Sequence, residues 1–326
     1  MQDLIATWQS TTFVDAASEW VDEVLAQRGV QCTGELEPHK VRFWAAVFSA
    51  QTTAGRVWLK VANPGQGFEG ALLQSLGQLR PDEVMTPMAV NAERGWWLLP
   101  DGGPTLREIA NSEAVWVDLL RQVAGSQKAL AHEGVSLAMV PRLSARDAPS
   151  HLASLIDDLA LRPDSDAQAI TAREAATLSA GLSTFGADMA LLDALGIPDT
   201  LQINDVHLGN ACGPAHDGGP FRLFDLGDAF WSHPFAVLHL PLRVAVGLGL
   251  ADPLPREAAQ GTLTSTYLEL WPEISRDQWL TVLAAADKLG ALHRAASWTR
   301  LLREVDPQRL GMPPPTIADW VRQALA

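Results

Sequence analysis

The most constraining feature of this chain is a set of polar residues at fixed spacing in its second half. Asp205-Val-His-Leu-Gly-Asn210 contains an acid and an amide, and Phe224-Asp225-Leu-Gly-Asp228 follows with two further acids. Apolar residues lead into Asp225, which is therefore predicted to follow directly on a short strand. The order predicts two loops that bring an acid, an amide and a second acid close together.

Phosphoryl transfer from Mg-ATP uses this set of groups. One carboxylate orients and deprotonates the attacking hydroxyl, while an amide oxygen and a second carboxylate bind the metal ions. The kinase pattern is D-x-x-x-x-N followed by D-F-G. The first part is complete here, and the second has Leu226 in place of Phe. Because Asp and Asn are each common in loops, only the ordered combination indicates this chemistry.

The N-terminal half offers an independent check. Arg56 to Val61 alternates polar and apolar residues and predicts a half-buried strand, with Lys60 near its end. Glu69 opens an apolar-periodic segment at 68–79 that predicts a helix. A strand lysine paired with a helix glutamate is the ion pair with which kinases hold the α- and β-phosphates. The alternative is a surface lysine and a first-turn glutamate favoured by the helix dipole.

Composition favours a globular protein of the reduced cytoplasm. The chain has 326 residues, of which 47% are hydrophobic, enough for two lobes with a sizeable core. No run approaches the roughly 20 apolar residues that span a bilayer, and the first residues lack the features of a signal peptide. Two cysteines, Cys32 and Cys212, argue against a disulfide scaffold. We therefore expect a cytoplasmic protein that does not bind membranes.

The net charge limits the classes of binding partner that we expect. The value of −14, with no offsetting basic patch, disfavours binding to nucleic acid or to anionic membranes. An acidic protein attracts cationic substrates such as an aminated sugar, although solubility explains the charge equally well. Nothing in the sequence indicates an obligate protein partner.

Hydrophobic periodicity predicts an α+β fold. In the first part we expect a helix at 15–27, strands at 33–37, 41–50, 56–61, 85–90 and 95–99, and the helix at 68–79. Glycine and proline at 100–104 predict a linker. Beyond it the predicted helices are 105–134, 150–161, 167–195, 235–248, 256–270, 277–303 and 317–326. The expected domains are a β-rich N-terminal lobe, residues 1–100, and a larger helical C-terminal lobe, residues 101–326.

With these motifs in order, the chain resembles the aminoglycoside and choline kinase branch of the protein-kinase-like superfamily, and most closely its small-molecule phosphotransferases of actinobacterial type. The resemblance covers residues 33 to about 298. Besides the residues above, it rests on Trp97-Leu-Leu-Pro-Asp-Gly-Gly and on Ser232-His-Pro-Phe235. It implies a bilobal protein-kinase-like fold, with ATP and Mg²⁺ as cofactors.

The resemblance also implies roles for individual residues. Asp205 is expected to be the catalytic base. Asn210 and Asp225 are the implied magnesium ligands. Lys60 and Glu69 form the pair that holds the phosphates. The backbone from Leu99 to Asp101 is expected to receive adenine.

The chain departs from the family pattern at two places. Relatives usually carry a histidine two residues before the base, where this chain has Ile203. A change in loop packing is the expected result. Between the first two strands there is no G-x-G-x-x-G; Gly34 to Lys40 occupies that place, so coverage of the phosphates does not follow from the sequence.

Two alternative roles fit each of several further residues. His207 either contacts substrate or phosphate or forms a hydrogen bond within its loop. Asp228 either lies near the metals or caps a helix, and Asp101 either meets a cationic substrate or caps the helix that follows. Arg294 and Trp298, on one predicted helix, either line the acceptor pocket or supply packing and surface charge.

Two classes of function fit these observations. The first is a kinase that phosphorylates a hydroxyl of a small polar molecule, such as a sugar, an amino sugar or an aminoglycoside-like compound. The second is a catalytically silent nucleotide-binding or regulatory protein that keeps the fold. The complete set of Lys, Glu, Asp, Asn and Asp favours the first. Asp225 runs almost directly into Ser232, without the long segment that protein kinases use to dock a peptide, so we expect a small acceptor.

Overall fold

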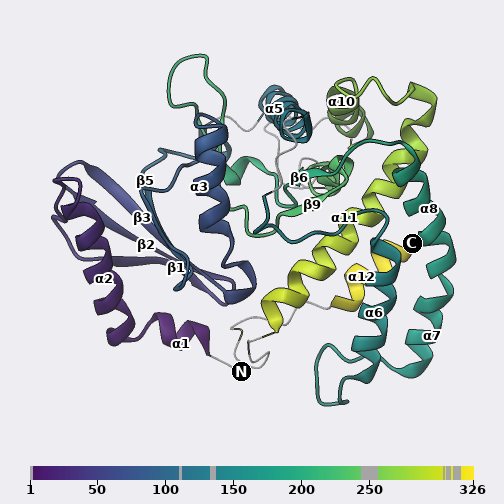
Figure 1. Cartoon of the computed structure of the whole chain (residues 1–326), viewed down its shortest axis with the longest axis horizontal. Helices are drawn as coiled ribbons and strands as arrows, with labels where there is room; N and C mark the ends of the chain where they lie inside the picture. The colour runs from purple at the N-terminus through teal and green to yellow at the C-terminus, as the bar shows by residue number, and fades with distance from the viewer. Residues whose placement is uncertain are drawn as a thin grey trace. The chain divides into compact units, whose positions relative to one another are not determined.

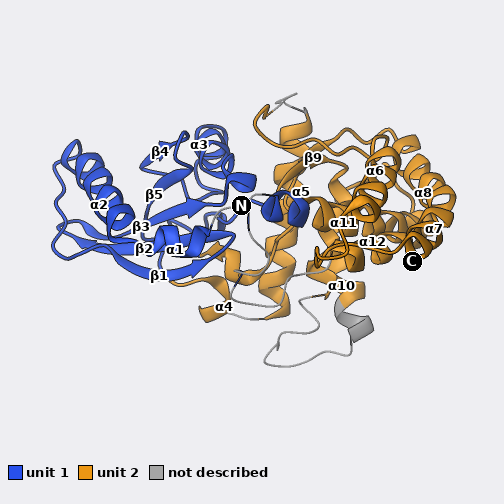
Figure 2. Ribbon diagram, turned by 90° about the horizontal axis from the view of Figure 1, so that it is seen from below, with its two compact units in different colours: residues 1–103, 213–227, 297–315 blue, residues 104–212, 228–296, 316–326 orange. Residues whose placement is uncertain are grey.

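The structure, a computed structural model, describes residues 3–109, 112–132, 137–243, 256–303, 305, 310 and 317–326. The chain divides into two compact units, and each draws on segments far apart in the sequence (Figure 2). Unit 1 comprises residues 1–103, 213–227 and 297–315, and unit 2 comprises residues 104–212, 228–296 and 316–326. The predicted division into lobes at residues 100 and 101 stays a prediction.

Unit 1 is built on a five-stranded antiparallel sheet with the order β1-β2-β3-β5-β4 (Figure 1). Its strands are β1 (Glu37–Arg42), β2 (Ala45–Thr52), β3 (Gly55–Ala62), β4 (Ala89–Asn91) and β5 (Trp96–Pro100). Strand β3 lies in the middle, between β2 and β5. Residues Val57 to Val61 of β3, which include Lys60, are therefore paired with a strand on each side.

The two faces of the sheet are covered by different helices. Helix α2 (Thr11–Ala26) packs on one face, where the ring of Phe13 lies 6.0 Å from Phe48 and 5.3 Å from Trp96. Helix α3 (Glu69–Leu79) packs on the other face, over Trp97. A Cβ at Gly70 would lie 3.0 Å from the Trp97 ring, so glycine permits this close approach. A shorter helix, α1 (Leu4–Trp8), precedes α2.

The first strand lies further along the chain than the sequence pattern predicts. The pattern placed strands at 33–37 and 41–50 and left Pro38 outside both, but β1 runs from Glu37 to Arg42 and contains that proline. The reason is its position: β1 is an edge strand, with an irregularity between Pro38 and Lys40. An edge strand tolerates a residue that has no N–H to donate.

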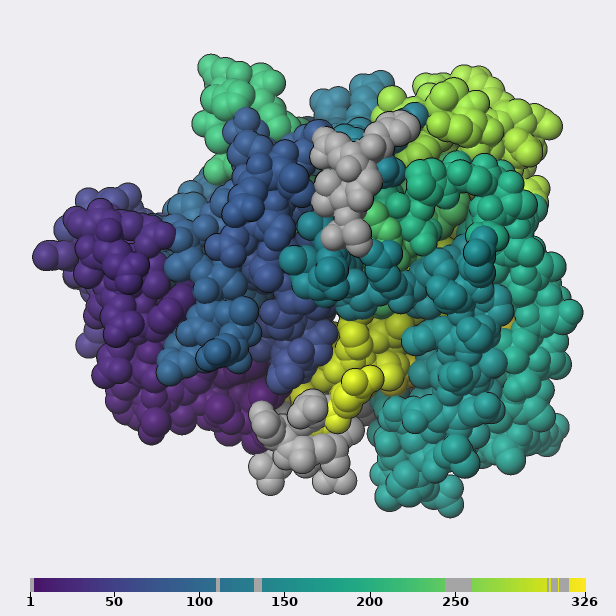
Figure 3. Space-filling model, viewed as in Figure 1, coloured from purple at the N-terminus to yellow at the C-terminus, as the bar shows by residue number. Residues whose placement is uncertain are grey.

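Strand β4 is shorter than predicted because part of the segment pairs elsewhere. Val84 forms a parallel bridge with Leu223, and the Met85 N–H donates to the Leu223 carbonyl at 2.9 Å. The chain segment 213–227 is thereby tied to unit 1. Its exposed turn at 214–218, green in Figure 3, projects from the surface.

Unit 2 is mainly helical. It contains α4 (Leu106–Ile109), α5 (Glu113–His132), α6 (Ala148–Leu161), α7 (Ala172–Ala180), α8 (Leu182–Ala194), α10 (Arg256–Leu268), α12 (Ile317–Leu325) and residues 279–296 of α11 (Trp279–Leu302). The helix predicted at 167–195 is two helices, which meet at Gly181. The prediction for 235–248 was wrong at its start, where Pro234–His239 forms a 3-10 helix, η3; residues 244–248 lie outside the described residues.

Among the described residues, no single helix is long and apolar enough to cross a membrane. The bent pair α7 and α8 reaches the length and hydropathy of a membrane span only when its two helices are counted together.

A short strand pair positions the polar motif of unit 2. Strands β6 (Thr200–Gln202) and β9 (Phe230–Ser232) are antiparallel. Gln127 of α5 anchors β6, because its Nε2 donates to the Leu201 carbonyl at 3.2 Å and its own carbonyl accepts from Thr200 Oγ1 at 2.8 Å. The hydroxyl of Tyr267, in α10, donates to Gln127 Oε1 at 2.6 Å. Buried hydrogen bonds thus fix the strand from which the loop at 203–210 leaves.

Candidate functional site

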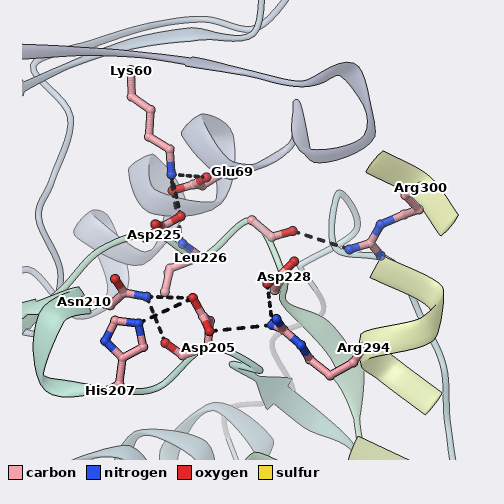
Figure 4. Close-up of polar contacts among 11 residues, drawn as sticks. Lys60, Glu69, Asp205, His207, Asn210, Asp225, Leu226, Asp228, Arg294 and Arg300 are labelled. Atoms are coloured by element: carbon pink, nitrogen blue, oxygen red, sulfur yellow. Dashed lines mark hydrogen bonds and ion pairs between the residues drawn. The ribbon is translucent and has the colours of Figure 1, made fainter. Parts of the chain in front are cut away.

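In unit 1 the structure brings together three of the residues singled out from the sequence. Lys60 Nζ, from β3, lies 2.9 and 2.8 Å from the two carboxylate oxygens of Glu69 and 2.6 Å from Asp225 Oδ1 (Figure 4). The side chains of Lys60 and Glu69 are 12% and 1% exposed. Lys60 is therefore not a surface lysine, and Glu69, although it lies in the first turn of α3, is buried against it.

The charges in this cluster depend on one another. Burial alone lowers the pKa of Lys60, but the carboxylates of Asp225 and Glu69 more than offset that effect, so the pKa is raised and Lys60 stays a cation. Burial raises the pKa of Glu69 to about 7, against the ammonium of Lys60 and the Leu226 N–H, which donates to Oε1 at 3.1 Å. Lys60 is therefore a buried ammonium group held in place by two carboxylates, and an ammonium group is what kinases place on phosphate oxygens.

The backbone around Asp225 explains the local sequence. Among the described residues, Asp225 is the one non-glycine residue with positive φ, at 62°. This left-handed conformation costs free energy for most side chains, and such residues cluster at functional sites. A Cβ at Gly227 would lie 2.8 Å from the Gln66 side chain and 3.0 Å from the Glu69 carboxylate. Glycine at this position therefore lets the loop approach the Lys60–Glu69 pair.

In unit 2 a second cluster surrounds Asp205. Asn210 Nδ2 donates to the Asp205 carbonyl and to its Oδ2, both at 3.0 Å. His207 Nε2 lies 3.7 Å from Asp205 Oδ2. Arg294 Nη1, from α11, lies 3.6 Å from Asp205 Oδ1 and 2.8 Å from Asp228 Oδ2 (Figure 4). The structure thus brings Asp205, the candidate base, into contact with the residues that orient its carboxylate.

A buried histidine supports this loop. His293 Nδ1 lies 3.2 Å from Asn204 Oδ1, and His293 Nε2 lies 3.0 Å from Ser232 Oγ. Asn204 Nδ2 donates in turn to the Asp228 carbonyl at 2.6 Å. The ring of His293 stacks on Phe230 at 4.8 Å. His293 therefore links Asn204, the residue before the base, to Ser232 at the end of β9. Ile203 is also buried.

Asn210 in unit 2 and Asp225 in unit 1 each carry an oxygen atom of the kind that binds magnesium. Asn210 Nδ2 donates to two oxygens of Asp205, so Oδ1 of Asn210 is the atom suited to a cation. The Asp225 side chain is 46% exposed. Carboxylate and amide oxygens are the ligands that Mg²⁺ takes, together with water and substrate phosphates. Among the described residues there is no cluster of three or more His, Cys, Asp or Glu in metal-binding geometry, and a magnesium ion held partly by phosphates does not need one.

The expected adenine-binding segment, Leu99 to Asp101, follows the last residue of β5 that pairs with β4. The β4–β5 ladder ends at Leu98, so the backbone from Leu99 onward extends past β4. Asp101 Oδ1 accepts from Trp58 Nε1 at 3.2 Å and from the Gly103 N–H at 3.1 Å. The start of α4 is capped instead by the pair Thr105 and Glu108, so Asp101 stabilises the turn.

Trp298 lies with other aromatic residues of unit 1. Its ring centroid is 5.8 Å from that of Phe43 and 6.4 Å from that of Trp44. Packing in an aromatic cluster accounts for this tryptophan. The pocket role considered for it gains no support from these contacts.

Comparison with known proteins identifies the fold. No protein-family model and no curated protein sequence matches the chain. Among solved structures, a choline kinase from Cryptosporidium parvum has a TM-score of 0.60 at 8% identity, covering 95% of this chain and 93% of that chain. A macrolide 2'-phosphotransferase type I has a TM-score of 0.54 at 12% identity, covering 97% and 96%. An aminoglycoside phosphotransferase from Streptomyces rimosus has a TM-score of 0.50 at 16% identity, covering 83% and 98%.

These likenesses define the fold. The chain has the α+β, protein-kinase-like fold of small-molecule kinases and phosphotransferases, as the sequence predicts. The structures it resembles are aminoglycoside, macrolide and choline kinases rather than one specific enzyme, and they do not single out an actinobacterial branch. At these identities the likeness shows the fold alone.

Proposed function

We propose that this chain is a small-molecule kinase that transfers the γ-phosphate of Mg-ATP to a hydroxyl group. The observation that carries the proposal is the contact of Lys60 Nζ with both Glu69 and Asp225. The cation is enclosed, and its neighbour Asp225 lies in an unfavourable backbone conformation. A protein that had lost phosphoryl transfer would have no need to keep this arrangement together with a candidate base.

The residues have distinct parts in the proposed reaction. Asp205 accepts the proton of the attacking hydroxyl, and its carboxylate is oriented by Asn210 and Arg294. Lys60 binds the phosphates, with Glu69 holding its side chain in place. Mg²⁺, when bound, would neutralise charge on the phosphates. Its proposed oxygen ligands are Asn210 and Asp225.

The proposed acceptor is a small polar molecule of the sugar, amino sugar or aminoglycoside-like class. Strand β9 begins at Phe230 and the 3-10 helix η3 at Pro234, directly after Asp228. This leaves no long segment that would dock a peptide. Cys32 and Cys212 do not form a disulfide, which supports a reduced cytoplasm as the proposed compartment.

A panel of acceptors tests the proposal. Purified protein would be incubated with Mg-ATP and neutral sugars, amino sugars, aminoglycosides, choline and a generic protein substrate, and ADP and phosphorylated products would be measured. We expect Mg²⁺-dependent transfer to at least one small molecule, and its loss in Asp205→Asn by about 10²–10⁴-fold. Tight nucleotide binding without any turnover would favour the silent regulatory protein. Transfer to the protein substrate alone would refute the choice of acceptor.

A further inference from the structure

Three buried polar side chains of unit 2 connect α11 to the loop that carries Asp205. His293, Asn204 and Ser232 are 0%, 4% and 0% exposed. His293, on α11, contacts Asn204 through Nδ1 and Ser232 through Nε2. Asn204 immediately precedes the base, and the residue before it, Ile203, has an apolar side chain that offers no hydrogen bond. The network therefore reaches the loop one residue from the candidate base.

The hydrogen bonds of Asn204 determine which nitrogen of His293 donates. Asn204 Nδ2 lies 2.6 Å from the Asp228 carbonyl, and a carbonyl oxygen only accepts. The amide nitrogen of Asn204 therefore faces Asp228, which leaves Oδ1 facing His293. Because Oδ1 is an acceptor, Nδ1 of His293 carries a proton and donates it across 3.2 Å.

The imidazole is held in this orientation by its other neighbours. Its ring stacks on that of Phe230, with centroids 4.8 Å apart and an interplanar angle of 15°. Ser232 Oγ, which lies 3.0 Å from Nε2, also donates to the Leu143 carbonyl. The direction of the Nδ1–H group is thus fixed before any substrate binds, which is what support of a reacting group requires.

One helix holds the loop at two points. Asn204 ties the loop to the backbone of Asp228, and His293 in turn holds Asn204. Arg294, the next residue of α11, lies 2.8 Å from Asp228 Oδ2 and 3.6 Å from Asp205 Oδ1 (Figure 4). Arg294 thus contacts the carboxylate of the base, while His293 acts on the backbone that precedes it.

We propose that His293 is a positioning residue for the base. Through Asn204 it holds the backbone in the conformation from which the Asp205 carboxylate reaches the attacking hydroxyl. This proposal rests on the proposed function and adds a residue to its mechanism. In the transfer the acceptor oxygen bonds to the γ-phosphorus, the bond from that phosphorus to the β–γ bridging oxygen breaks, the hydroxyl proton goes to Asp205, and ADP leaves. His293 exchanges no proton with the substrate, and it acts through geometry, since a displacement of about 1 Å costs about 10²-fold in rate.

Two substitutions of His293 separate the contributions of its two nitrogens. The amide nitrogen of asparagine takes the place of Nδ1, and that of glutamine takes the place of Nε2. His293→Asn therefore keeps a donor for Asn204, whereas His293→Gln keeps the contact with Ser232 and loses that donor. The assay uses Mg-ATP and the compound of the acceptor panel with the highest kcat/KM. We expect kcat to fall about 10- to 100-fold in His293→Gln and to stay close to the wild-type value in His293→Asn, with a much smaller change in the KM for ATP.

A second variant and a control separate positioning from stability. Asn204→Ala removes the link itself and should lower kcat as far as His293→Gln does. The double variant should be no slower than either single variant, because both changes break the same connection. The control is His239→Gln, since His239 is also buried, at 3% exposed, and contacts α11 through Asp287 at 2.9 Å. It should lower the melting temperature without lowering kcat.

Nitrogen-15 NMR of the histidine rings tests the contact without turnover. The signals of His293 are those that disappear in His293→Asn. We expect a proton on Nδ1 in the wild-type protein, and a shift of this signal in Asn204→Ala. If His293→Gln does not fold, His293→Asn, Asn204→Ala and the ring spectrum decide.

Each outcome has one meaning. Equal values of kcat in His293→Asn and His293→Gln, or a ring with no proton on Nδ1, would overturn the proposal and leave the proposed kinase intact. A fall of kcat in His239→Gln as large as that in His293→Gln would show that lost stability is the cause, and would also overturn it. The absence of Mg-ATP turnover by the wild-type protein with every acceptor would refute the proposed function itself.

Discussion

Glu69 is the residue at which the energetics of the candidate site are most directly measurable. Replacing it by alanine removes both oxygens that contact Lys60 Nζ and the acceptor for the Leu226 N–H. Breaking a buried ion pair by removing one partner costs about 3–5 kcal/mol. Asp225 remains 2.6 Å from Nζ and keeps Lys60 partly compensated, which places the loss near the lower end. The unpaired Leu226 N–H adds about 1–3 kcal/mol. Since these effects share partners and are not additive, we expect Glu69→Ala to lower the free energy of unfolding by about 4 kcal/mol.

Guanidinium chloride denaturation measures this loss as a shift in midpoint. Glu69→Gln should cost less, because the one oxygen Oε1 accepts from both Lys60 and Leu226 and glutamine retains an oxygen at that place. The control is Glu269→Ala, which removes a partner of Arg276 in an ion pair whose side chains are 53% and 77% exposed. It should cost no more than about 1 kcal/mol.

A double-mutant cycle with Lys60→Met gives the coupling. In that background Glu69→Ala should lose much less stability than in the wild type, because the buried cation is gone. The reasoning is refuted if Glu69→Ala is as mild as Glu269→Ala, or if the cost of Glu69→Ala is the same with and without Lys60.

Three further predictions concern separate parts of the chain. Asp225→Asn should weaken metal-dependent nucleotide binding in calorimetry, whereas Asp205→Asn should leave binding nearly intact; equal binding defects would contradict this division of roles. Gly227→Ala should destabilise the fold by about 1–3 kcal/mol through overpacking, whereas Gly125→Ala, in α5 with open space around its Cβ position, should be neutral or stabilising by up to about 1 kcal/mol; similar effects at the two sites would count against the close approach at 227. Burial lowers the pKa of His233 from 6.5 to about 3, so the unfolded chain takes up the proton first and stability falls as pH drops from 6.5 towards 3, by at most about 1.4 kcal/mol per pH unit; in His233→Asn the slope in this range should be smaller, and an unchanged slope would be evidence against a buried neutral histidine.

The sequence predicts the parts of the fold and site that depend on local patterns. A strand that ends near Lys60 and a helix that begins at Glu69 follow from residue periodicity over a few turns. The contact between the two side chains was a hypothesis from motif order, and the structure shows it at 2.8 Å. Local signals were enough because the loop and helix that carry Glu69 follow directly on β3.

Long-range placement is what the sequence does not supply. Nothing near Arg294 indicates that it meets Asp205 and Asp228, since the contact depends on where α11 packs. The edge position of β1, which admits Pro38, likewise depends on the order of strands in the sheet. One signal was present: His293 and Arg294 stand together in an otherwise apolar stretch of α11, where a buried charge requires a partner. That rule predicts a partner for each residue but does not identify it.

The backbone conformation of Asp225 bears on how a protein of this kind diverges over evolutionary time. At φ of 62°, asparagine and glycine are tolerated in addition to aspartate, while β-branched or bulky residues are disfavoured. Exchange of Asp225 for asparagine thus removes a charge and preserves the chain's path. A change at Glu69 costs stability, because its buried carboxylate contacts Lys60 and accepts from the Leu226 N–H. A lineage that leaves catalysis behind is therefore expected to change first at 225 and to retain 69, ending as a folded descendant with a new use for the same scaffold.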